Sequence, residues 1–465
     1  MLKLPPIRFA GPIACCRILR VSHIRFARRL LSERSYVVVM SPAVARFENR
    51  TRHLIALRLL PFLFILYITN FVDRTNLAFA ALGMARDLGF SDRMFGMGAG
   101  IFFVSYLALQ VPGALLVERW SARGIISATL VTWGLLTALT ALVHTPVQLY
   151  LARFALGAAE AGFFPGVIVY LSHWFVRRDR AKATSNFMAA IPLSIIIGSP
   201  VAGWVLEHNW FGVQGWRWLF IVEGLPAIML GVVAFFFLTD LPSEAHWLLP
   251  EQRQWIARKL EEEKPTIHQS ATLGQTLHSR ALLFLAGAAF LNYFLGYAVV
   301  FWLPTVLKRQ SGFSDAWVGI LGAMPSVVGL IVMQVNGWHS DRSRERRWHA
   351  AIPMFICAAG LLCLISSPRS SLMTVLWFSQ ISVQTAFLPV FWAIPTEILS
   401  ESTAAFAVGM INALASVAGF VGPYAFGYLT TRTGSLLSGF TVLTCCAIGS
   451  GVLMLFTPVT PHPRS

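Results

Sequence analysis

The sequence predicts an all-α, polytopic membrane protein with twelve transmembrane helices in two repeats of six. Of its 465 residues, 56% are hydrophobic and 12% are charged, whereas soluble domains carry about 25% charged residues. Apolar runs of about 20 residues, the length that a helix needs to cross a bilayer core, recur along the chain. Short motifs also recur at one fixed offset, which indicates that the two halves are related.

Hydropathy divides the chain into an N-terminal six-helix bundle over 53–238, a polar linker over 239–280 and a C-terminal six-helix bundle over 281–457. In the linker, Pro250 followed by Glu251 is typical of the start of a short helix. The predicted spans of the first half lie near 58–81, 96–117, 125–144, 148–171, 184–206 and 218–238. Those of the second half lie near 281–304, 317–337, 350–367, 371–396, 402–429 and 435–457.

The two ends of the chain lie outside these bundles. Residues 1–52 form a basic segment that we expect to be disordered, and 458–465 form a short tail. Residues 1–39 hold eight Lys or Arg residues against one acid, Glu33, without an apolar run long enough to span a membrane. Because they also lack the apolar core and cleavage site of a signal peptide, we expect either a translation start at Met40 or a disordered arm.

The distribution of Lys and Arg predicts that both termini and the linker are cytoplasmic. Two loops on that side, in "HWFVRRDRAKA" and "HSDRSRERRWH", each hold four Lys or Arg residues, whereas "HTPVQ" on the other side holds none. The prediction depends on the sum, because the outer loops also carry cations: Arg86, Arg93, Lys308 and Arg309.

An internal repeat with an offset of 223 residues supports the two-bundle organisation. "GFSDRMFG" at Gly89–Gly96 matches "GFSDAWVG" at Gly312–Gly319. The acid–Arg–x₃–Arg pattern of "ERWSAR" matches that of "DRSRER", and Pro200 matches Pro423, at the same offset. Two parallel six-helix repeats are typical of transporters that bind substrate near the membrane midplane between the halves.

Other classes of protein are disfavoured. The net charge of +16 could indicate a nucleic-acid partner, but the basic residues lie in short loops between spans, as orientation signals do. The sequence has no cysteine spacing typical of a metal site, no Walker A pattern and no nucleophile with a base nearby. We therefore expect no nucleic-acid partner, no metal, no cofactor and no enzyme activity.

Several motifs resemble the major facilitator superfamily, and within it the anion:cation symporter family of tartrate, phthalate and sugar-acid permeases. They are "YITNFVDRTNLAFA", "RFALGAAEAGFFPGVIVYLSHWF", "GWRWLFIVEGLPA", "GWHSDRSRERRWH" and "WAIPTEILSESTAAFAVGMINALASVAGFVGPYAFGYL". The resemblance covers the chain from about Arg46 to Thr457. It implies the major facilitator fold and secondary active transport by alternating access.

Charged residues inside the spans are the candidates for the transport site, because ionisable groups at membrane depth are costly unless they face a protein interior or a water-filled cavity. Asp73 and Arg74 lie two-thirds along the first span. They project about 100° apart on a helix, so both can border one cavity. Arg153 and Glu160 in the fourth span lie on nearly the same face, about 10 Å apart along the axis. Gly157 between them allows a neighbouring helix or a ligand to approach.

The resemblance to sugar-acid carriers extends these candidates to a full site. It implies substrate-binding roles for Arg74, Tyr106, Arg153, Asn292, Trp392 and Asn412, with Tyr297 as a further cavity residue. Arg74 would hold the substrate carboxylate, because a guanidinium matches a carboxylate bidentately. Asp73 and Glu160 would be the proton-coupling acids, and an anion on Arg74 would weaken its hold on Asp73 and favour protonation there.

Structural roles remain open for the same residues. Asp73 and Arg74 could form a static ion-pair network, Glu160 could serve gating or helix packing, and Arg153 could be purely structural. The aromatic and amide side chains could provide ordinary packing or hydrogen bonds between helices.

Two loop motifs resemble the superfamily's charged signature, which would latch the helices in one access state. Such a latch can contribute only a few kcal/mol, because both states must be populated during turnover. The alternative is that these charges only set the topology. The degenerate first copy comprises Gly113, Glu118, Arg119 and Arg123, and the second comprises Gly337, Asp341, Arg342, Arg346 and Arg347.

The sequence therefore predicts a proton-coupled symporter of a small organic carboxylate, such as a sugar acid, a tartrate-like acid or an aromatic acid. We expect a monomer in the cytoplasmic (inner) membrane, with an organic anion, the proton and the lipid bilayer as its partners. An exchanger or exporter of organic anions, or a non-transporting receptor on the same fold, are the alternatives.

Overall fold

The computed structural model describes residues 42–263, 280–366, 370–398 and 401–457. The chain divides into two units, Met1–Leu54 and Ile55–Ser465. In the first unit, the described part is the beginning of helix α2 (Pro42–Leu88). Residues 42–52, the end of the segment that we expected to be disordered, are helical. The predictions for residues 1–41, for 264–279 of the linker and for 458–465 lie outside the described residues.

Twelve helical spans long and apolar enough to cross a membrane occur within the described parts of the chain, which confirms the predicted fold class. The first half contains α2, α3 (Asp92–Arg119), α4 (Ala122–Thr140), α5 (Pro146–Glu160) with α6 (Phe163–Trp174), α7 (Arg177–Met188) with α8 (Ala190–Leu206), and α9 (Gly215–Phe237). The second contains α12 (Arg280–Ser311), α13 (Asp315–Ser343), α14 (Arg347–Ser366), α15 (Ser371–Ile381) with η3 (Ser382–Ala386) and α16 (Phe387–Ile398), α17 (Glu401–Thr433) and α18 (Leu436–Phe456).

Short elements lie between these spans. The loop before α9 contains η1 (Trp210–Gly212), and the linker contains η2 (Pro242–Glu244) and α10 (Pro250–Glu262). Helix α10 begins at Pro250, as the sequence predicts, because proline lacks the N–H that would be unsatisfied in the first turn anyway.

Three spans are interrupted, and a proline follows shortly after each interruption. Proline removes the hydrogen bond to the carbonyl four residues earlier and clashes with it. Other prolines, including Pro200 and Pro423, lie inside continuous helices, so the proline alone does not decide a break. In the three interrupted spans, the residue four positions before the proline lies at the interruption. The pairs are Ala161 with Pro165, Met188 with Pro192, and Thr385 with Pro389.

The internal repeat has the same local structure in both halves. Gly89 and Gly312 both have φ of 66°, a left-handed conformation that glycine adopts without strain. Two residues later, Ser91 and Ser314 cap α3 and α13 by accepting hydrogen bonds from the backbone amides of Met94 and Trp317.

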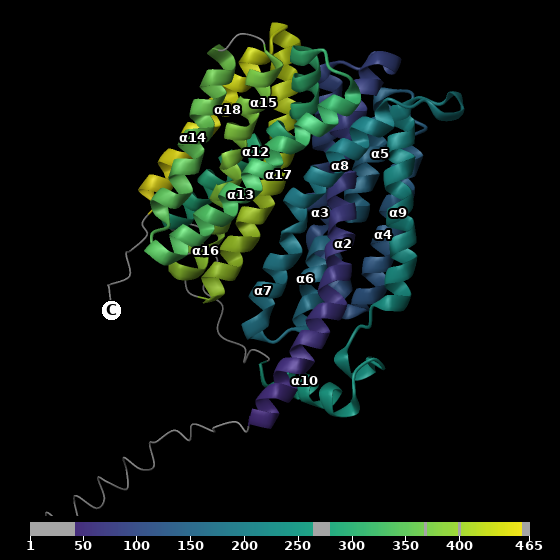
Figure 1. Ribbon diagram of the computed structural model, residues 1–465, viewed down its shortest axis with the longest axis vertical. Helices are drawn as coiled ribbons and strands as arrows, with labels where there is room; N and C mark the ends of the chain where they lie inside the picture. Colours follow the sequence, from purple (N-terminus) through teal and green to yellow (C-terminus); the bar gives the residue numbers. More distant parts are fainter. Residues whose placement is uncertain (1–41, 264–279, 367–369, 399–400, 458–465) are drawn as a thin grey trace, which may run out of the picture. The chain divides into compact units, whose positions relative to one another are not determined.

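Two pairs of helices join the halves, α3 with α17 and α8 with α13 (Figure 1). These contacts are also related by the repeat. Gly96 of α3 lies against the backbone of Pro423, and its equivalent, Gly319 of α13, lies against Gly203 of α8. Small residues at these positions allow helix backbones to approach closely, as is common in membrane proteins.

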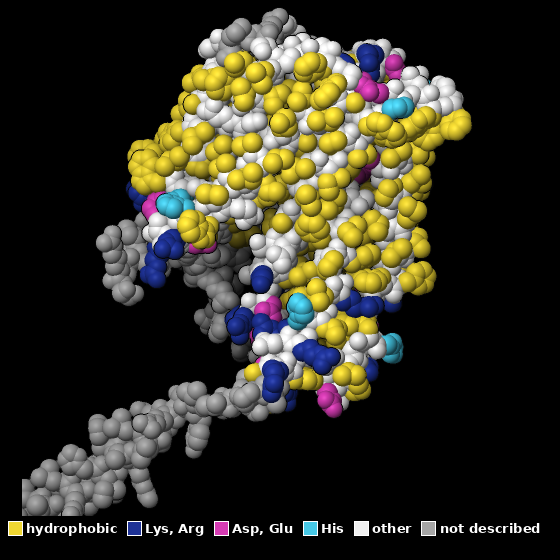
Figure 2. Space-filling view, viewed as in Figure 1, with side chains coloured by type: hydrophobic (Ala, Val, Ile, Leu, Met, Phe, Trp, Pro, Cys, Tyr) yellow, Lys and Arg dark blue, Asp and Glu magenta, His cyan; other side chains and the backbone are white. Residues whose placement is uncertain are grey.

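The surface is divided as a membrane requires. Figure 2 shows hydrophobic side chains over the middle of the helices and charged side chains gathered near α7 and α10. We call the end of the protein at which α7 and α10 lie the linker end. Arg58 of α2 packs over the ring of Phe237 at the end of α9, 4.7 Å from its centroid. This contact shows that the beginning of the α2 span and the end of α9 both lie at the linker end. The other ends of these helices, near Arg86 and Gly215, form the distal end.

Candidate transport site

The centre of the first half contains a buried ion pair between α2 and α5. Arg74 Nη2 lies 2.9 Å from Glu160 Oε2, and Asn70 Nδ2 donates to the same oxygen at 2.8 Å. Asn70 and Arg74 are four residues apart, so both project from one face of α2. Glu160 is the last residue of α5, next to the break in that span, and its other oxygen has no hydrogen-bond partner.

Aromatic rings surround the Arg74 guanidinium. Its carbon lies 5.0 Å from the centre of the Tyr106 ring and 5.2 Å from that of Phe102. Tyr297 of α12, from the second half, also interacts with it electrostatically. The structure therefore brings Tyr106 and Tyr297, both predicted from the sequence, to Arg74.

Arg153 also lies beside the Phe102 ring, 5.0 Å from its centroid. The side chain is 1% exposed, and none of its three guanidinium nitrogens has a hydrogen-bond partner in the structure. A buried charge is costly unless it is paired. Gly157, on the same helix, lies so close to the Phe102 carbonyl of α3 that a side chain there would clash. Of the two predicted roles, close approach of a helix or of a ligand, the structure shows the first.

Asp73 projects away from Arg74. Its carboxylate accepts hydrogen bonds from Thr137 of α4 at 2.9 Å and from Asn76 at 3.0 Å. The acid that pairs with Arg74 is Glu160, whereas the sequence led us to expect a contact between Arg74 and Asp73. Asp73 and Arg74 have different partners because adjacent residues project about 100° apart on a helix.

Glu223 of α9 is a buried acid to which the sequence reasoning gave no role. It is 6% exposed, interacts with Asp73 and with the Asn76 amide, and its Oε2 has no hydrogen-bond partner. Its signal was present in "GWRWLFIVEGLPA", because an acid within an apolar span is a functional candidate by itself.

The residues predicted from the second half lie at different places. Trp392 of α16 donates to the Tyr293 hydroxyl at 3.3 Å, and the Tyr293 ring stacks on Tyr297, with centroids 6.2 Å apart. Trp392 thus connects to Arg74 through two tyrosines. Asn292 donates instead to Gln384 at 2.9 Å, in the interior of the second half. Asn412 of α17 is half-buried, and its carbonyl accepts from Ser416 at 3.2 Å.

At the distal end, two ion pairs join the halves and are related by the 223-residue offset. Arg86 of α2 pairs with Asp315 of α13 at 2.8 Å, and the equivalent Arg309 of α12 pairs with Asp92 of α3. Lys308 also pairs with Asp315 at 2.8 Å. Arg86, Lys308 and Arg309, three of the four outer-loop cations that weakened the Lys and Arg bias, therefore pair with acids. A cavity of about 270 Å³ lies beside these pairs, lined by residues of both halves.

The first loop motif, at the linker end, is held within its own half. The backbone amide of Arg123 and the hydroxyl of Ser121 donate to Asp240, which follows α9, at 2.8 and 2.7 Å. Gly113 of α3 lies against Gly162 at the break between α5 and α6. Arg119 is exposed, and the side chain of Glu118 lies outside the described residues.

The second loop motif has its own polar contacts. Arg346 pairs with Asp341 at 2.5 Å and donates to the Ser340 hydroxyl at 3.0 Å. Arg342 is exposed, 5.8 Å from the centre of the Trp338 ring. Gly337 faces Pro389 of α16.

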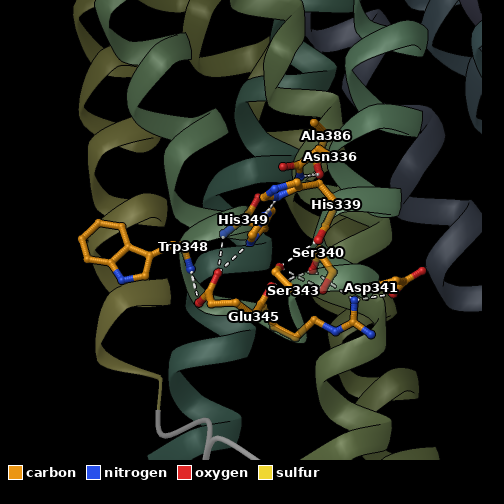
Figure 3. A network of polar contacts seen from close by, with 10 residues as sticks. Asn336, His339, Ser340, Asp341, Ser343, Glu345, Trp348, His349 and Ala386 are labelled. Atoms are coloured by element: carbon orange, nitrogen blue, oxygen red, sulfur yellow. Dashed lines mark hydrogen bonds and ion pairs between the residues drawn. The ribbon is translucent and has the colours of Figure 1, made fainter.

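Next to this motif, Glu345 caps the start of α14 (Figure 3). Its carboxylate accepts from the backbone amides of Trp348 at 2.8 Å and His349 at 3.2 Å, and contacts His349 Nδ1 at 2.7 Å. His349 Nε2 lies 2.6 Å from His339 Nδ1. Burial alone would raise the pKa of Glu345, but these hydrogen bonds lower it below its ordinary value.

With the fold and these contacts in place, comparison with known proteins gives the family. The model of the Major Facilitator Superfamily matches residues 63–423. The chain belongs to this superfamily. It is an integral membrane protein and a secondary transporter.

Relatives cover almost the whole chain. A protein of Agrobacterium vitis named as a tartrate transporter is 39% identical over 416 residues, 88% of this chain and 91% of its own. The metabolite transport protein NicT of Pseudomonas putida is 36% identical, over 86% of this chain and 93% of its own. The quinolone resistance transporter of Acinetobacter baumannii is 34% identical, over 88% of this chain and 94% of its own.

Solved structures agree on the fold. The D-xylose-proton symporter superposes with a TM-score of 0.68 at 14% identity, and covers 87% of this chain and 98% of its own. At this identity the likeness concerns the fold alone, and the substrate has to be argued from the site.

Proposed function

We propose that this transporter takes up a small organic carboxylate together with a proton, by alternating access. The observation that carries the proposal is that two guanidinium groups lie about 5 Å from the centre of the Phe102 ring: Arg74, which is paired with Glu160, and Arg153, which has no hydrogen-bond partner. Two buried cations near one aromatic ring suit an organic anion with two polar ends. The Tyr106 and Tyr297 rings add an amphipathic wall.

The Arg74–Glu160 pair suggests how the anion and the proton are coupled. Arg74 cannot give its full bidentate face to a substrate while Glu160 holds it. A proton on Glu160 weakens that pair and frees Arg74 for the substrate carboxylate. Conversely, a bound anion reduces the attraction between Arg74 and Glu160, which favours the protonated acid. The substrate and the proton therefore strengthen each other's binding, as linkage requires.

The distribution of contacts between the halves supports an inward-facing state. At the distal end, Arg86 and Arg309 pair with acids of the opposite half, and Lys308 joins the first of these pairs. At the linker end, Figure 2 shows the surface hollowed near α7 and α16. With the Lys and Arg bias of the loops, we place the linker and both termini in the cytoplasm, so that the site faces inward.

The test is transport by the purified protein in liposomes. An inward proton gradient should drive accumulation of at least one member of a panel of hydroxylated dicarboxylates, sugar acids and aromatic acids. Arg74→Gln should abolish this accumulation, whereas Arg432→Gln, the same change at an exposed site at the end of α17, should leave it intact. If no acid accumulates under any proton gradient, the symport proposal fails.

A second candidate is export of anionic compounds in exchange for protons. It is favoured by the similarity to a relative named as a quinolone resistance transporter. The two are distinguished by loading the liposomes with the acid and imposing each gradient in turn. An exchanger releases the acid under an inward proton gradient, because protons enter as the acid leaves, whereas the proposed symporter releases it under an outward gradient.

A further inference from the structure

Away from the Arg74–Glu160 pair, a second group of buried polar residues lies between α2, α4 and α9. It comprises Asp73 and Asn76 of α2, Thr137 of α4 and Glu223 of α9, and we call it the inner acid cluster. Asp73, Asn76 and Thr137 are each at most 1% exposed, and Glu223 is 6% exposed. Helices α4 and α9 pack closely along their length, so the cluster is enclosed within one half.

The hydrogen bonds of this cluster lack one donor. The hydroxyl of Thr137 and the amide nitrogen of Asn76 both donate to Asp73. Two buried acceptor oxygens then remain without a partner, Glu223 Oε2 and Asn76 Oδ1. Buried polar atoms in proteins are almost always satisfied. A proton on Glu223 turns its carboxylate into a donor, which is what the two orphaned acceptors require.

The buried charges of this half are also one proton short of neutrality. The acids are Asp73, Glu160 and Glu223, and the bases are Arg74 and Arg153. Arg74 pairs with Glu160, and Arg153 interacts with Asp73 without a hydrogen bond. Glu223 is the acid left over.

The helices packed on α9 bring no further charge to the cluster, and Arg217, on α9 itself, instead contacts the Ala141 carbonyl and His144 Nδ1. Beyond Arg123 at its start, α4 contains no ionisable residue, and α8, which also packs on α9, contains none. An isolated carboxylate in such surroundings is costly, and taking up a proton removes the cost.

We propose that Glu223 is a proton-binding site, and that its carboxylic acid donates a hydrogen bond to Asn76, whose amide donates in turn to Asp73. The proton enters as H⁺ and converts the Glu223 carboxylate into a carboxylic acid, so that no other reactant is needed. The site is separate from the guanidinium that faces the substrate, and it contacts α2 and α9 together. For its part in transport the inference rests on the proposed proton coupling, but proton binding itself does not.

Infrared difference spectroscopy of the purified protein tests the binding. On stepping the pH, a protonated buried carboxyl gives a carbonyl band that is lost as the proton leaves. We expect this band in the wild type and its loss in Glu223→Gln, an isosteric change whose amide supplies the missing donor. Glu251→Gln, at an exposed position on α10, should keep the wild-type band. A wild-type band in Glu223→Gln overturns the proposal.

Two further measurements complete the test. Glu223→Asp, which keeps a carboxyl, should show the band at a shifted frequency, and it serves as the variant if Glu223→Gln does not fold. An unshifted band in Glu223→Asp overturns the assignment. In liposomes, Glu223→Gln should lose proton-driven accumulation and keep substrate counterflow, and accumulation at the wild-type level overturns the coupling role. If the wild type accumulates no acid, the proposed function fails while the spectra still decide whether Glu223 binds a proton.

Discussion

Replacing Asp315 by Asn should release the closure of the distal end. Its carboxylate is 5% exposed and accepts ion pairs from Arg86 and Lys308, both at 2.8 Å. The neutral amide removes both attractions and leaves two cations facing each other. Because Arg86 belongs to the first half and Asp315 to the second, the loss favours the state in which these halves separate.

The expected magnitude follows from the exposure of the partners. Exposed ion pairs contribute about 0.2–1 kcal/mol each. Only the Arg86–Asp315 pair crosses between the halves, since Lys308 and Asp315 both belong to the second half. Because the Arg86 side chain is 57% exposed but Asp315 is buried, we take the upper end for this pair, about 1 kcal/mol. This free energy corresponds to an increase of roughly fivefold in the ratio of distally open to closed molecules.

Cysteine labelling measures that ratio. Leu82 lines the distal cavity and is 8% exposed, so a cysteine there reacts mainly when this end opens. In a background without the natural cysteines, Leu82→Cys should react with a maleimide roughly fivefold faster when Asp315→Asn is added. Arg86→Gln should give a smaller increase, and the double variant should show less than the sum, since the two residues form one contact.

Asp87→Asn is the matched control for this experiment. Asp87 lies at the same end of α2, but its partner, Trp216 Nε1 at 2.6 Å, belongs to the same half. Its loss should leave the labelling rate unchanged. If Asp315→Asn reacts at the wild-type rate, the ion pairs do not hold this end closed and the inference of an inward-facing state loses its main support.

Three other changes test the site and its frame. Arg74→Lys should raise the substrate KM at least tenfold in liposome uptake, because a point charge cannot replace bidentate binding; an unchanged KM would place the anion elsewhere. Gly157→Ala should destabilise the protein by about 1–3 kcal/mol in thermal unfolding, because the added methyl overpacks α5 against α3; equal melting would show that the helices can move apart. Glu345→Gln should lower the melting temperature near neutral pH by removing the cap of α14. The pKa of Glu345 is lowered in the folded state, so this stabilisation is present above the ordinary Glu pKa and fades in acid; a difference that grows in acid would contradict it.

Much of the architecture was accessible from the sequence because it depends on local composition. Apolar runs of bilayer length predicted the twelve spans, and these are confirmed. The repeat offset predicted the equivalence of "GFSDRMFG" and "GFSDAWVG", and the structure gives Gly89 and Gly312 the same backbone angle. The same offset also relates two ion pairs that were not predicted from the sequence. Arg86 pairs with Asp315, and the equivalent Arg309 pairs with Asp92.

Partners of the buried charges were less accessible. The sequence identified Arg74, Arg153 and Glu160 as polar residues at membrane depth, and the structure buries all three. It could not show that Arg74 pairs with Glu160 while Asp73 turns towards Thr137, because the rotation of α2 depends on all the helices packed around it. Asn292 illustrates the same limit, since its amide is engaged by Gln384 from a distant span.

By itself, the sequence determined the class of protein, the number of spans, the two-fold repeat and the short set of ionisable residues in the apolar segments. These follow from hydrophobic transfer and helix geometry, which act on neighbouring residues. Only the tertiary structure decided which charges meet, that Arg153 lacks a hydrogen-bond partner, and that Glu223 joins Asp73. Those outcomes depend on contacts between helices far apart in the chain, and a few degrees of helix rotation decide which buried acid a given arginine neutralises.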